Sequence, residues 1–186
     1  MRSLCVFCGS SPGDQPEYMD LARDAGRLIA ERQLTLIYGG GKVGLMGALA
    51  DAALAAGGRV VGIIPQMLMD REAAHRGLTQ LRVVSTLSER KFQMGVMADA
   101  FLTLPGGIGT LDELFEAWSW AQLGLHKKPN GLLNFRGYYD PLIQFMDRSV
   151  SVGFLRPEHR AALLVGAELG PLLDRLQDAA KVAPAA

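Results

Sequence analysis

Short, almost wholly apolar segments alternate with segments of helical periodicity along the chain. The apolar segments are residues 3–8, 35–38, 59–65, 81–84, 100–104, 131–135 and 163–165. Helical patterns cover residues 17–32, 44–56, 88–98, 111–123, 139–152 and 171–180. Strands without polar alternation are buried on both faces, and strands separated by helices pair in parallel. We therefore predict an α/β fold with a doubly wound parallel sheet and helices on both faces.

Length and composition favour a single globular domain. The 186 residues are 49% hydrophobic and 20% charged, and 19 basic residues balance 19 acidic ones. This balance gives no support for a nucleic acid or a membrane as partner, and no apolar run reaches the ~18 residues of a membrane span. The N-terminal segment does not resemble a secretory signal, so we expect a cytoplasmic protein. Its one domain would cover residues 1–181, with a frayed tail at 182–186.

Cys5 and Cys8 form a C-x-x-C pattern inside the first predicted strand. Residues three apart in a strand point to opposite faces and lie roughly 10 Å apart, beyond the ~7 Å between Cα atoms that a disulfide allows. The three histidines, His75, His126 and His159, lack the spacing of metal ligands. We interpret both cysteines as core residues and expect no metal site.

The glycine-rich turn at residues 104–113 has the composition of an anion-binding site. It reads Leu-Pro-Gly-Gly-Ile-Gly-Thr-Leu-Asp-Glu and joins a predicted strand to a predicted helix. Its glycines let a phosphate approach backbone N–H groups, and the positive end of the helix dipole adds attraction. Other glycine turns follow the strands that end near residues 8 and 38. Because ligands bind beyond the carboxyl ends of parallel strands, we expect the three turns to build one pocket.

The pattern leaves two roles open for Glu113. Thr110 and Glu113 have the spacing of a capping box, in which Thr110 is the N-cap and Glu113 reaches back to its amide. If the turn instead holds a phosphate, Glu113 lies one turn further along, beside the rest of a nucleotide. Arg90 and Lys91 follow another predicted strand and would lie at the same edge, unless they only form a solvated helix start.

Two nucleotide-binding fingerprints fail at residues 39–44, which read Gly-Gly-Gly-Lys-Val-Gly. The stretch matches G-x-G-x-x-G, but the next strand ends at Pro65 and Gln66 without the acidic residue that would hold a ribose diol. A Walker loop fails too, because Val43 follows Lys42 where Ser or Thr is needed. The stretch remains a generic glycine turn, which either faces a polar ligand or packs against its helix.

Together these motifs resemble those of the LONELY GUY family. Residues 105–113 match its P-G-G-x-G-T-x-x-E motif, and Arg90 and Lys91 match its upstream R-K pair, 23 residues before Glu113. The resemblance covers most of the chain, running from residues 5–11 through 38–41, 44–47, 120–124 and 137–139 to about residue 163.

This resemblance implies a Rossmann-like fold, usually homodimeric, that hydrolyses the N-glycosidic bond of cytokinin riboside 5′-monophosphates. These are N6-modified forms of AMP, and the products are the free base and ribose 5-phosphate; some bacterial relatives also act on AMP. Carried over by position, Arg90 and Glu113 would be the catalytic pair. The implied substrate-binding residues are Glu72, Arg90, Lys91, Gly106, Gly107, Ile108, Gly109, Thr110, Leu111, Asp112, Glu113 and Ser119. The resemblance implies no cofactor.

Three positions depart from the family pattern. Ile108 stands where many members have Tyr, Asp112 where Glu is common, and Ser119 where Thr is common. Only the change at position 108 removes a hydroxyl, so base preference is the property that we expect to differ.

Two other functions fit these residues less well. A non-catalytic carrier or sensor of a nucleotide or molybdopterin on the same fold need not keep both Arg90 and Glu113. The family was formerly labelled lysine decarboxylase, and a pyridoxal enzyme needs a Schiff-base lysine in a cofactor site. The lysines, which are Lys42, Lys91, Lys127, Lys128 and Lys181, offer no such setting.

An apolar stripe runs along the helix that follows the glycine turn. Its members at helical spacing are Leu111, Leu114, Phe115, Trp118 and Gln122. We interpret the stripe as core or as a subunit contact, and with Trp120 it favours a homodimer over a monomer.

Overall fold

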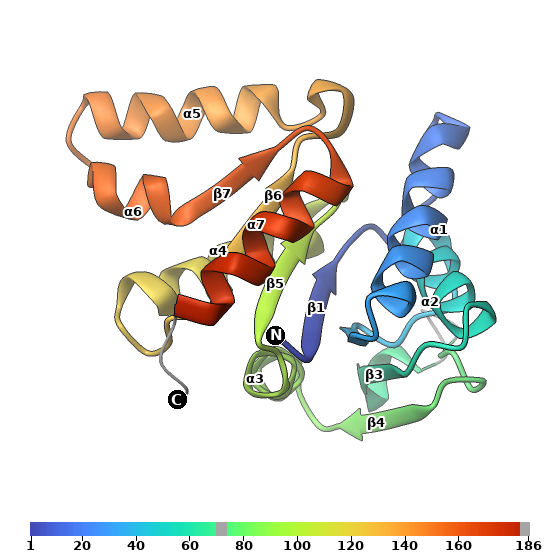
Figure 1. Ribbon diagram of the computed structural model, residues 1–186. Coiled ribbons are helices and arrows are strands. Elements are labelled where there is room, and N and C mark those ends of the chain that lie inside the picture. Colours follow the sequence, from blue (N-terminus) through green and yellow to red (C-terminus); the bar gives the residue numbers. More distant parts are fainter. Residues whose placement is uncertain (70–73, 183–186) are drawn as a thin grey trace.

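The computed structural model describes residues 1–69 and 74–182. Within them, seven parallel strands form one sheet in the order β4-β3-β2-β1-β5-β6-β7 (Figure 1). The strands are β1 (Ser3–Phe7), β2 (Thr35–Tyr38), β3 (Val60–Pro65), β4 (Gln80–Val84), β5 (Ala100–Thr103), β6 (Asn130–Leu133) and β7 (Leu163–Gly166). The predicted parallel sheet is confirmed, and every strand end lies within two residues of its predicted position.

Helices cover both faces of this sheet, as predicted. They are α1 (Pro16–Glu31), α2 (Gly44–Ala55), α3 (Leu87–Met97), α4 (Ile108–Gln122), α5 (Asp140–Ser151), α6 (Pro157–Ala162) and α7 (Leu169–Val182), with 3-10 turns η1 (Gln66–Leu68) and η2 (Phe135–Gly137). Residues of α1, α2 and α7 share one core cluster with Leu4 and Val6 of β1. Residues of α3 and α4 share the opposite cluster with Cys5 and Phe7. Adjacent β1 residues thus face opposite layers, which explains why the strand shows no polar alternation.

The cysteines follow the same geometry. Cys5 lies in the cluster under α3 and α4, whereas Cys8 lies in the cluster under α1 and α2. Both are buried and carry free thiols. Their interpretation as core residues is confirmed.

Two parts of the helical pattern differ from the prediction. The six-residue helix α6 was not expected, because it is too short to show a full amphipathic period. Helix α4 begins three residues earlier than predicted, at Ile108. The tail expected to fray starts at Val182, which is the last residue of α7, and residues 183–186 lie outside the described part of the chain.

The strand order places a natural binding crevice at β1 and β5. The chain runs outward from β1 through β2 and β3 to β4, then returns to place β5 on the other side of β1. At such a switch point the loops that leave two neighbouring strands diverge to opposite faces of the sheet and open a crevice between them. Here the diverging loops are the glycine turns that follow β1 and β5.

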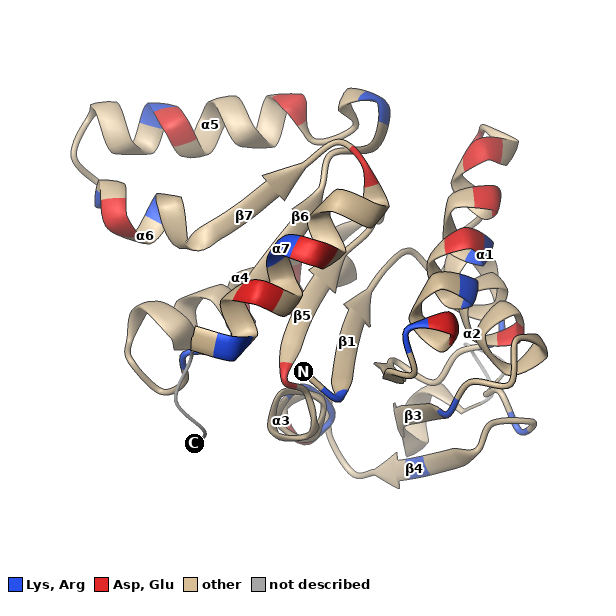
Figure 2. Cartoon of the chain, in the orientation of Figure 1, with Lys and Arg blue, Asp and Glu red and all other residues tan. Residues whose placement is uncertain are grey.

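Charged residues lie mainly on helices and turns (Figure 2). Helix α1 carries both signs, including i,i+3 pairs of Asp20 with Arg23 and of Asp24 with Arg27. Across the described residues, none of the helices has the length and apolar character needed to span a membrane.

Candidate functional site

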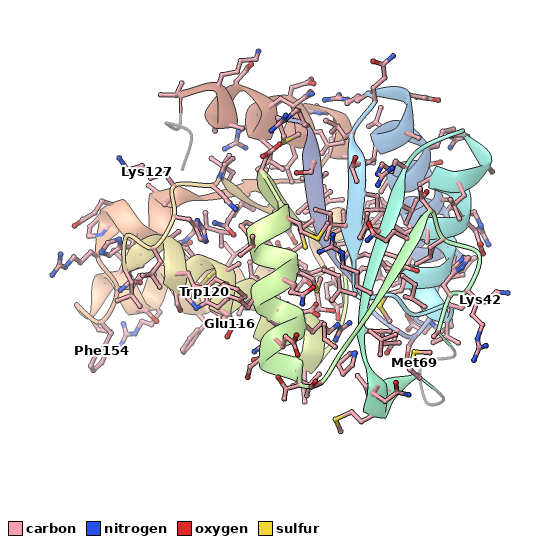
Figure 3. All side chains as sticks on the ribbon, turned by 90° about the horizontal axis from the view of Figure 1, so that it is seen from below. Lys42, Met69, Glu116, Trp120, Lys127 and Phe154 are labelled. Carbon is pink, nitrogen blue, oxygen red and sulfur yellow. The ribbon has the colours of Figure 1, made fainter. Side chains whose placement is uncertain are left out.

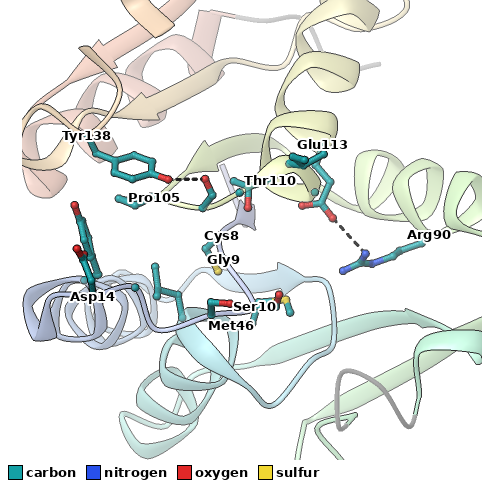
Figure 4. A pocket seen from close by; sticks show the side chains of 18 residues that line it. Cys8, Gly9, Ser10, Asp14, Met46, Arg90, Pro105, Thr110, Glu113 and Tyr138 are labelled. Atoms are coloured by element: carbon teal, nitrogen blue, oxygen red, sulfur yellow. Dashed lines mark hydrogen bonds and ion pairs between the residues drawn. The ribbon is translucent and has the colours of Figure 1, made fainter. Parts of the chain in front are cut away.

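A cavity of about 470 Å³ opens at the carboxyl ends of β1 and β5 (Figure 4). Its lining comes from five regions of the chain that are far apart in sequence. The lining residues are Cys8, Gly9, Ser10, Ser11, Gly13, Asp14, Tyr18, Leu45, Met46, Arg90, Pro105, Gly106, Gly107, Ile108, Gly109, Thr110, Glu113 and Tyr138. The prediction of a pocket at this edge is confirmed for the turns after β1 and β5. The turn after β2, Gly39 to Gly41, does not line the cavity.

The two lining turns touch through their backbones. The Gly9 N–H donates to the Pro105 carbonyl at 3.1 Å. A Cβ atom added to Gly106 would lie 2.8 Å from the Gly9 nitrogen and 2.1 Å from Thr110 Oγ1. Only glycine at position 106 therefore allows this approach, which forms the floor of the cavity.

The start of α4 lines the cavity and excludes the capping-box role, one of the two roles that the sequence leaves open for Glu113. Gly107, not Thr110, is the N-cap, and no side chain caps the helix. The N–H groups of Ile108, Gly109 and Thr110 therefore have no partner inside the helix, and they carry the positive end of the dipole. Glu113 lies in the second turn, too far along to cap. The capping pattern misled because Gly107, a glycine in an extended conformation, begins the helix with no side-chain signal.

Glu113 instead forms a buried ion pair with Arg90 at one end of the cavity. Arg90 Nη1 lies 3.5 Å from Glu113 Oε1, and the side chains are only 9% and 10% exposed. The guanidinium also donates through Nε to the Ile63 carbonyl at 3.1 Å and through Nη2 to the Gly39 carbonyl at 3.2 Å. Burial and these contacts hold both charged groups in one place.

Cys8 also lines the cavity, and its surroundings disfavour the reactive thiolate. Burial raises the pKa of its thiol well above the usual range, and the negative charge of Glu113 raises it further. A thiol that stays protonated is unreactive at neutral pH.

Two adjacent tyrosines brace the glycine turn of β5 from the side of β6. Tyr138 Oη donates to the Gly106 carbonyl at 2.9 Å, and Tyr139 Oη donates to the Leu104 carbonyl at 2.8 Å. Tyr138 lines the cavity opposite the Arg90–Glu113 pair (Figure 4). In the sequence, this tyrosine pair stands out only through the family resemblance. Its position depends on β6 lying next to β5, and no local spacing indicates that.

Of the substrate-binding residues expected from the sequence, several lie outside the cavity. Lys91 Nζ lies 2.9 Å from Asp112 Oδ2 and 2.9 Å from Glu116 Oε2, so that it ties α3 to α4. Figure 3 shows Glu116 and Trp120 of α4 beside α3. Leu111 packs in the core with Trp118, and Ser119 is exposed on α4. Glu72 falls outside the described residues. The roles of these residues in binding stay predictions.

The apolar stripe along α4 is core. Leu114 and Trp118 are buried with Leu132 and Met146, and Leu111 and Phe115 pack against them. The Trp118 indole donates to the His159 carbonyl at 3.0 Å.

Residues suited to other chemistries do not converge here. None of the chain's lysines, all of them within the described ranges, lines the cavity. Lys128, for example, donates to the Gly95 carbonyl at the end of α3. In the part of the chain that the structure describes, no three His, Cys, Asp or Glu side chains group as metal ligands.

Known proteins resemble this chain in sequence and in fold. Residues 46–176 match a family described as "Possible lysine decarboxylase". A cytokinin riboside 5′-monophosphate phosphoribohydrolase of Oryza sativa subsp. japonica is 45% identical over 177 residues, which is 95% of this chain and 73% of that protein. One of Arabidopsis thaliana is 44% identical over 177 residues, covering 95% of this chain and 82% of that protein.

The solved structures that resemble the chain share its fold. The molybdenum cofactor carrier protein MCP from Chlamydomonas reinhardtii aligns with a TM-score of 0.70 over 96% of this chain and 98% of that one. Its sequence identity is 19%, so the likeness concerns the fold alone. It supports the Rossmann-like sheet and carries no argument about activity.

Proposed function

We propose a function from the premise that this chain belongs to the LONELY GUY family, as its 45% identity over 95% of its length establishes. The relatives are named as phosphoribohydrolases, and the chain is accordingly a nucleotide N-glycosyl hydrolase. Its substrates are cytokinin riboside 5′-monophosphates, which it cleaves to the free base and ribose 5-phosphate. The observation that carries the proposal is the buried Arg90–Glu113 pair, at the end of a cavity that also receives the amides of α4.

The start of α4 supplies the phosphate site. The amides of Ile108, Gly109 and Thr110 point into the cavity with the positive end of the helix, and Gly106 and Gly107 keep Cβ atoms out of the way. A 5′-phosphate bound there is attracted by both the N–H groups and the dipole. Its ribose then lies along the first turns of α4, in reach of Glu113.

Glu113 acts where positive charge develops. Breaking the bond between C1′ of the ribose and the base passes through an oxocarbenium-like state, and a water oxygen completes the bond to C1′. A carboxylate beside C1′ stabilises this charge and orients the water or accepts its proton. The departing base takes up a proton and leaves with the bonding electron pair.

Arg90 contributes through charge and geometry. A guanidinium has a pKa above 12 and does not donate its proton to a leaving base. Its Nη1 lies 3.5 Å from Glu113 Oε1, so the positive charge attracts the carboxylate and helps to keep it in place.

The decisive experiment is Glu113→Gln in the purified protein. We expect base release from isopentenyladenosine monophosphate to fall by about 10²-fold or more, while AMP binding stays within a few-fold, because only the carboxylate charge is lost. The matched control is Glu116→Gln, one turn along α4 and outside the main cavity. Normal turnover by the Glu113 variant would contradict the proposal.

Substrate choice is tested with the wild-type protein. Base release from AMP and from isopentenyladenosine monophosphate is measured side by side at equal concentrations. A higher kcat/KM for the prenylated nucleotide supports the cytokinin substrate, and the reverse order assigns AMP as the substrate.

We further propose that the protein is a homodimer. Phe92 and Val96 lie one turn apart on α3 and are 59% and 61% exposed, and Leu123 and Leu125 beyond α4 are 71% and 70% exposed. Such apolar side chains favour burial against another surface. A cytoplasmic location is also proposed, since the two buried free thiols fit a reducing compartment.

A further inference from the structure

The glycine turn after β2 is not among the residues that line the cavity, but each of its carbonyls accepts a hydrogen bond. The Gly39 carbonyl accepts from Arg90 Nη2 at 3.2 Å. The Gly40 carbonyl accepts from the backbone N–H of His75 at 2.9 Å, and the Gly41 carbonyl accepts from Tyr38 Oη at 3.1 Å. A turn whose three successive carbonyls are fixed by buried groups is a rigid platform.

Arg90 lies directly on this platform. A Cβ atom added to Gly39 would come within 1.9 Å of Arg90 Nη2, so the guanidinium occupies the space that a side chain would take. Gly40 has φ of +80°, a conformation that favours glycine. Gly62 of β3 lies on the far side of the turn, where an added Cβ atom would be 2.8 Å from Gly40 Cα. Position 39 therefore needs glycine because Arg90 occupies the space of a side chain. Position 40 needs glycine because its φ is positive.

The platform selects which nitrogen of Arg90 faces Glu113. One edge of the guanidinium, formed by Nε and Nη2, donates to the carbonyls of Ile63 and Gly39 at the ends of β3 and β2. Because the group is planar, fixing this edge also fixes the direction of Nη1, which lies 3.5 Å from Glu113 Oε1.

The platform is itself anchored at two points. Tyr38 is fully buried, and its hydroxyl reaches Gly41 from the end of β2. His75 is 4% exposed, and its Nε2 pairs with Asp51 of α2 at 2.8 Å. A short bridge between Gly41 and Ala74 adds a backbone link. The anchors join the turn to β2 and α2.

We propose that the Gly39–Gly41 turn positions Arg90 for the reaction, with Tyr38 and His75 as positioning residues that hold the turn. This inference rests on the proposed function, and it gives a role to a glycine turn that lacks the complete dinucleotide and Walker fingerprints. The turn acts on the substrate only through Arg90 and Glu113.

A double-mutant cycle tests this dependence. Gly39→Ala should lower kcat for base release at least tenfold, because the new methyl group displaces the guanidinium. The double variant Gly39→Ala/Arg90→Ala should be no slower than Arg90→Ala alone, since an effect exerted through Arg90 vanishes with it. Losses that multiply, or a Gly39→Ala variant with wild-type kcat, would overturn the inference. The matched control is Gly131→Ala in β6, a buried glycine whose added Cβ atom would meet only the Leu176 side chain, at 3.0 Å.

A milder variant covers the case in which Gly39→Ala does not fold. Tyr38→Phe removes one hydroxyl and keeps the ring, and we expect kcat to fall several-fold while KM stays unchanged. A changed KM with an unchanged kcat would overturn the inference. Wild-type values of both constants would overturn it too.

A spectroscopic measurement separates this inference from the proposed function. The Nε–H resonance of Arg90, assigned through Arg90→Lys, should shift in Gly39→Ala and in Tyr38→Phe but not in Gly131→Ala. This holds whether or not the protein turns over a nucleotide. If wild-type protein releases no base while the resonance shifts as expected, the proposed function fails and the positioning role stands. If the resonance does not shift in Gly39→Ala and Tyr38→Phe, the turn does not position Arg90 and the inference is wrong.

Discussion

At the scale of the residue, the sequence allows Glu113 two roles, as part of a capping box or as a carboxylate beside a bound nucleotide. The structure excludes the first of them. Thr110 and Glu113 have the spacing of a capping box, but α4 starts at Ile108, so Glu113 lies in its second turn. Its carboxylate is buried against Arg90 instead. Removing two charges from water is costly unless each finds partners, which is why the Arg90 contacts to two backbone carbonyls matter.

Arg90→Lys tests whether the shape of the cation matters as well as its charge. A lysine keeps the charge but cannot donate to two carbonyls and a carboxylate in one plane, so we expect kcat to fall by roughly 10²-fold with little change in KM. Steady-state base release measures both constants. The control is Arg32→Lys, at the residue that follows α1 and pairs with Asp174 of α7. A kcat within threefold of wild type would show that charge alone suffices.

Ile108→Tyr tests the position that departs from the family pattern. Ile108 is 88% exposed at the rim of the cavity, so a tyrosine is accommodated without disturbing the core. We expect the ratio of kcat/KM between isopentenyladenosine monophosphate and AMP to change at least threefold, because a ring and a hydroxyl enter the rim. Thermal unfolding should be unaffected. An unchanged ratio would exclude this residue from base selection.

At the scale of the element, α4 begins in a way that serves a ligand rather than the helix. Gly107 is a weaker N-cap than Ser, Asp or Asn. The next three residues, whose N–H groups have no partner inside the helix, line the cavity. Uncapped amides lower helix stability and are available to an anion. At Gly107, a residue that stabilises the helix better would therefore weaken the binding of an anion.

Gly107→Asp tests this opposition. Position 107 has open space around an added Cβ atom, so the side chain fits. A carboxylate there caps the helix and meets its dipole, which should raise the free energy of unfolding by about 0.5 kcal/mol. The same charge repels the phosphate, so KM should rise at least tenfold. Gly107→Asn, which caps without charge, is the control, and an equal rise in KM for both variants would point to size rather than charge.

Asp99 holds together the amino ends of β1 and β5, whereas the cavity lies at the carboxyl ends of these strands. Its carboxylate accepts hydrogen bonds from the backbone N–H groups of Arg2 and Ser3. Burial alone would raise the pKa of Asp99, but these hydrogen bonds and the positive N-terminus outweigh it and lower the pKa. A lowered pKa means that the ionised carboxylate stabilises the folded state.

Asp99→Asn should therefore lower stability in a pH-dependent way. The contribution of Asp99 is complete above the unfolded-state pKa of about 3.9 and is lost as pH falls through the lower folded-state pKa. Urea midpoints of wild type and variant should differ at pH 7 and converge as pH falls below about 3.9. A constant difference across this range would show that Asp99 stabilises the protein by packing and not by charge.

At the scale of the whole molecule, the order of the strands creates the site. Residues about 100 positions apart, Gly9 and Gly106, touch because β5 returns to pair with β1. On α3, the apolar side chains of Phe92 and Val96 are exposed.

Phe92→Glu with Val96→Glu tests the proposed dimer. Placing two like charges on this stripe should prevent association, so sedimentation should change from the mass of two chains to that of one. The control is Phe154→Glu, which is 92% exposed in the turn between α5 and α6 (Figure 3). A wild-type protein with the mass of one chain at every concentration would contradict the dimer.

Sequence alone determined the parallel sheet, the glycine turns at its carboxyl edge and, through family resemblance, the Arg90–Glu113 pair. These follow from side chains close together in the chain or from a motif of fixed spacing, so local periodicity and composition reveal them. Only the tertiary structure decided where α4 starts, that Lys91 pairs with Asp112 and Glu116, and that Tyr138 braces Gly106. It also decided that the Gly39 carbonyl accepts a hydrogen bond from Arg90. Each of these depends on which strands and helices become neighbours, and that is set by the packing of the whole sheet rather than by any segment of it.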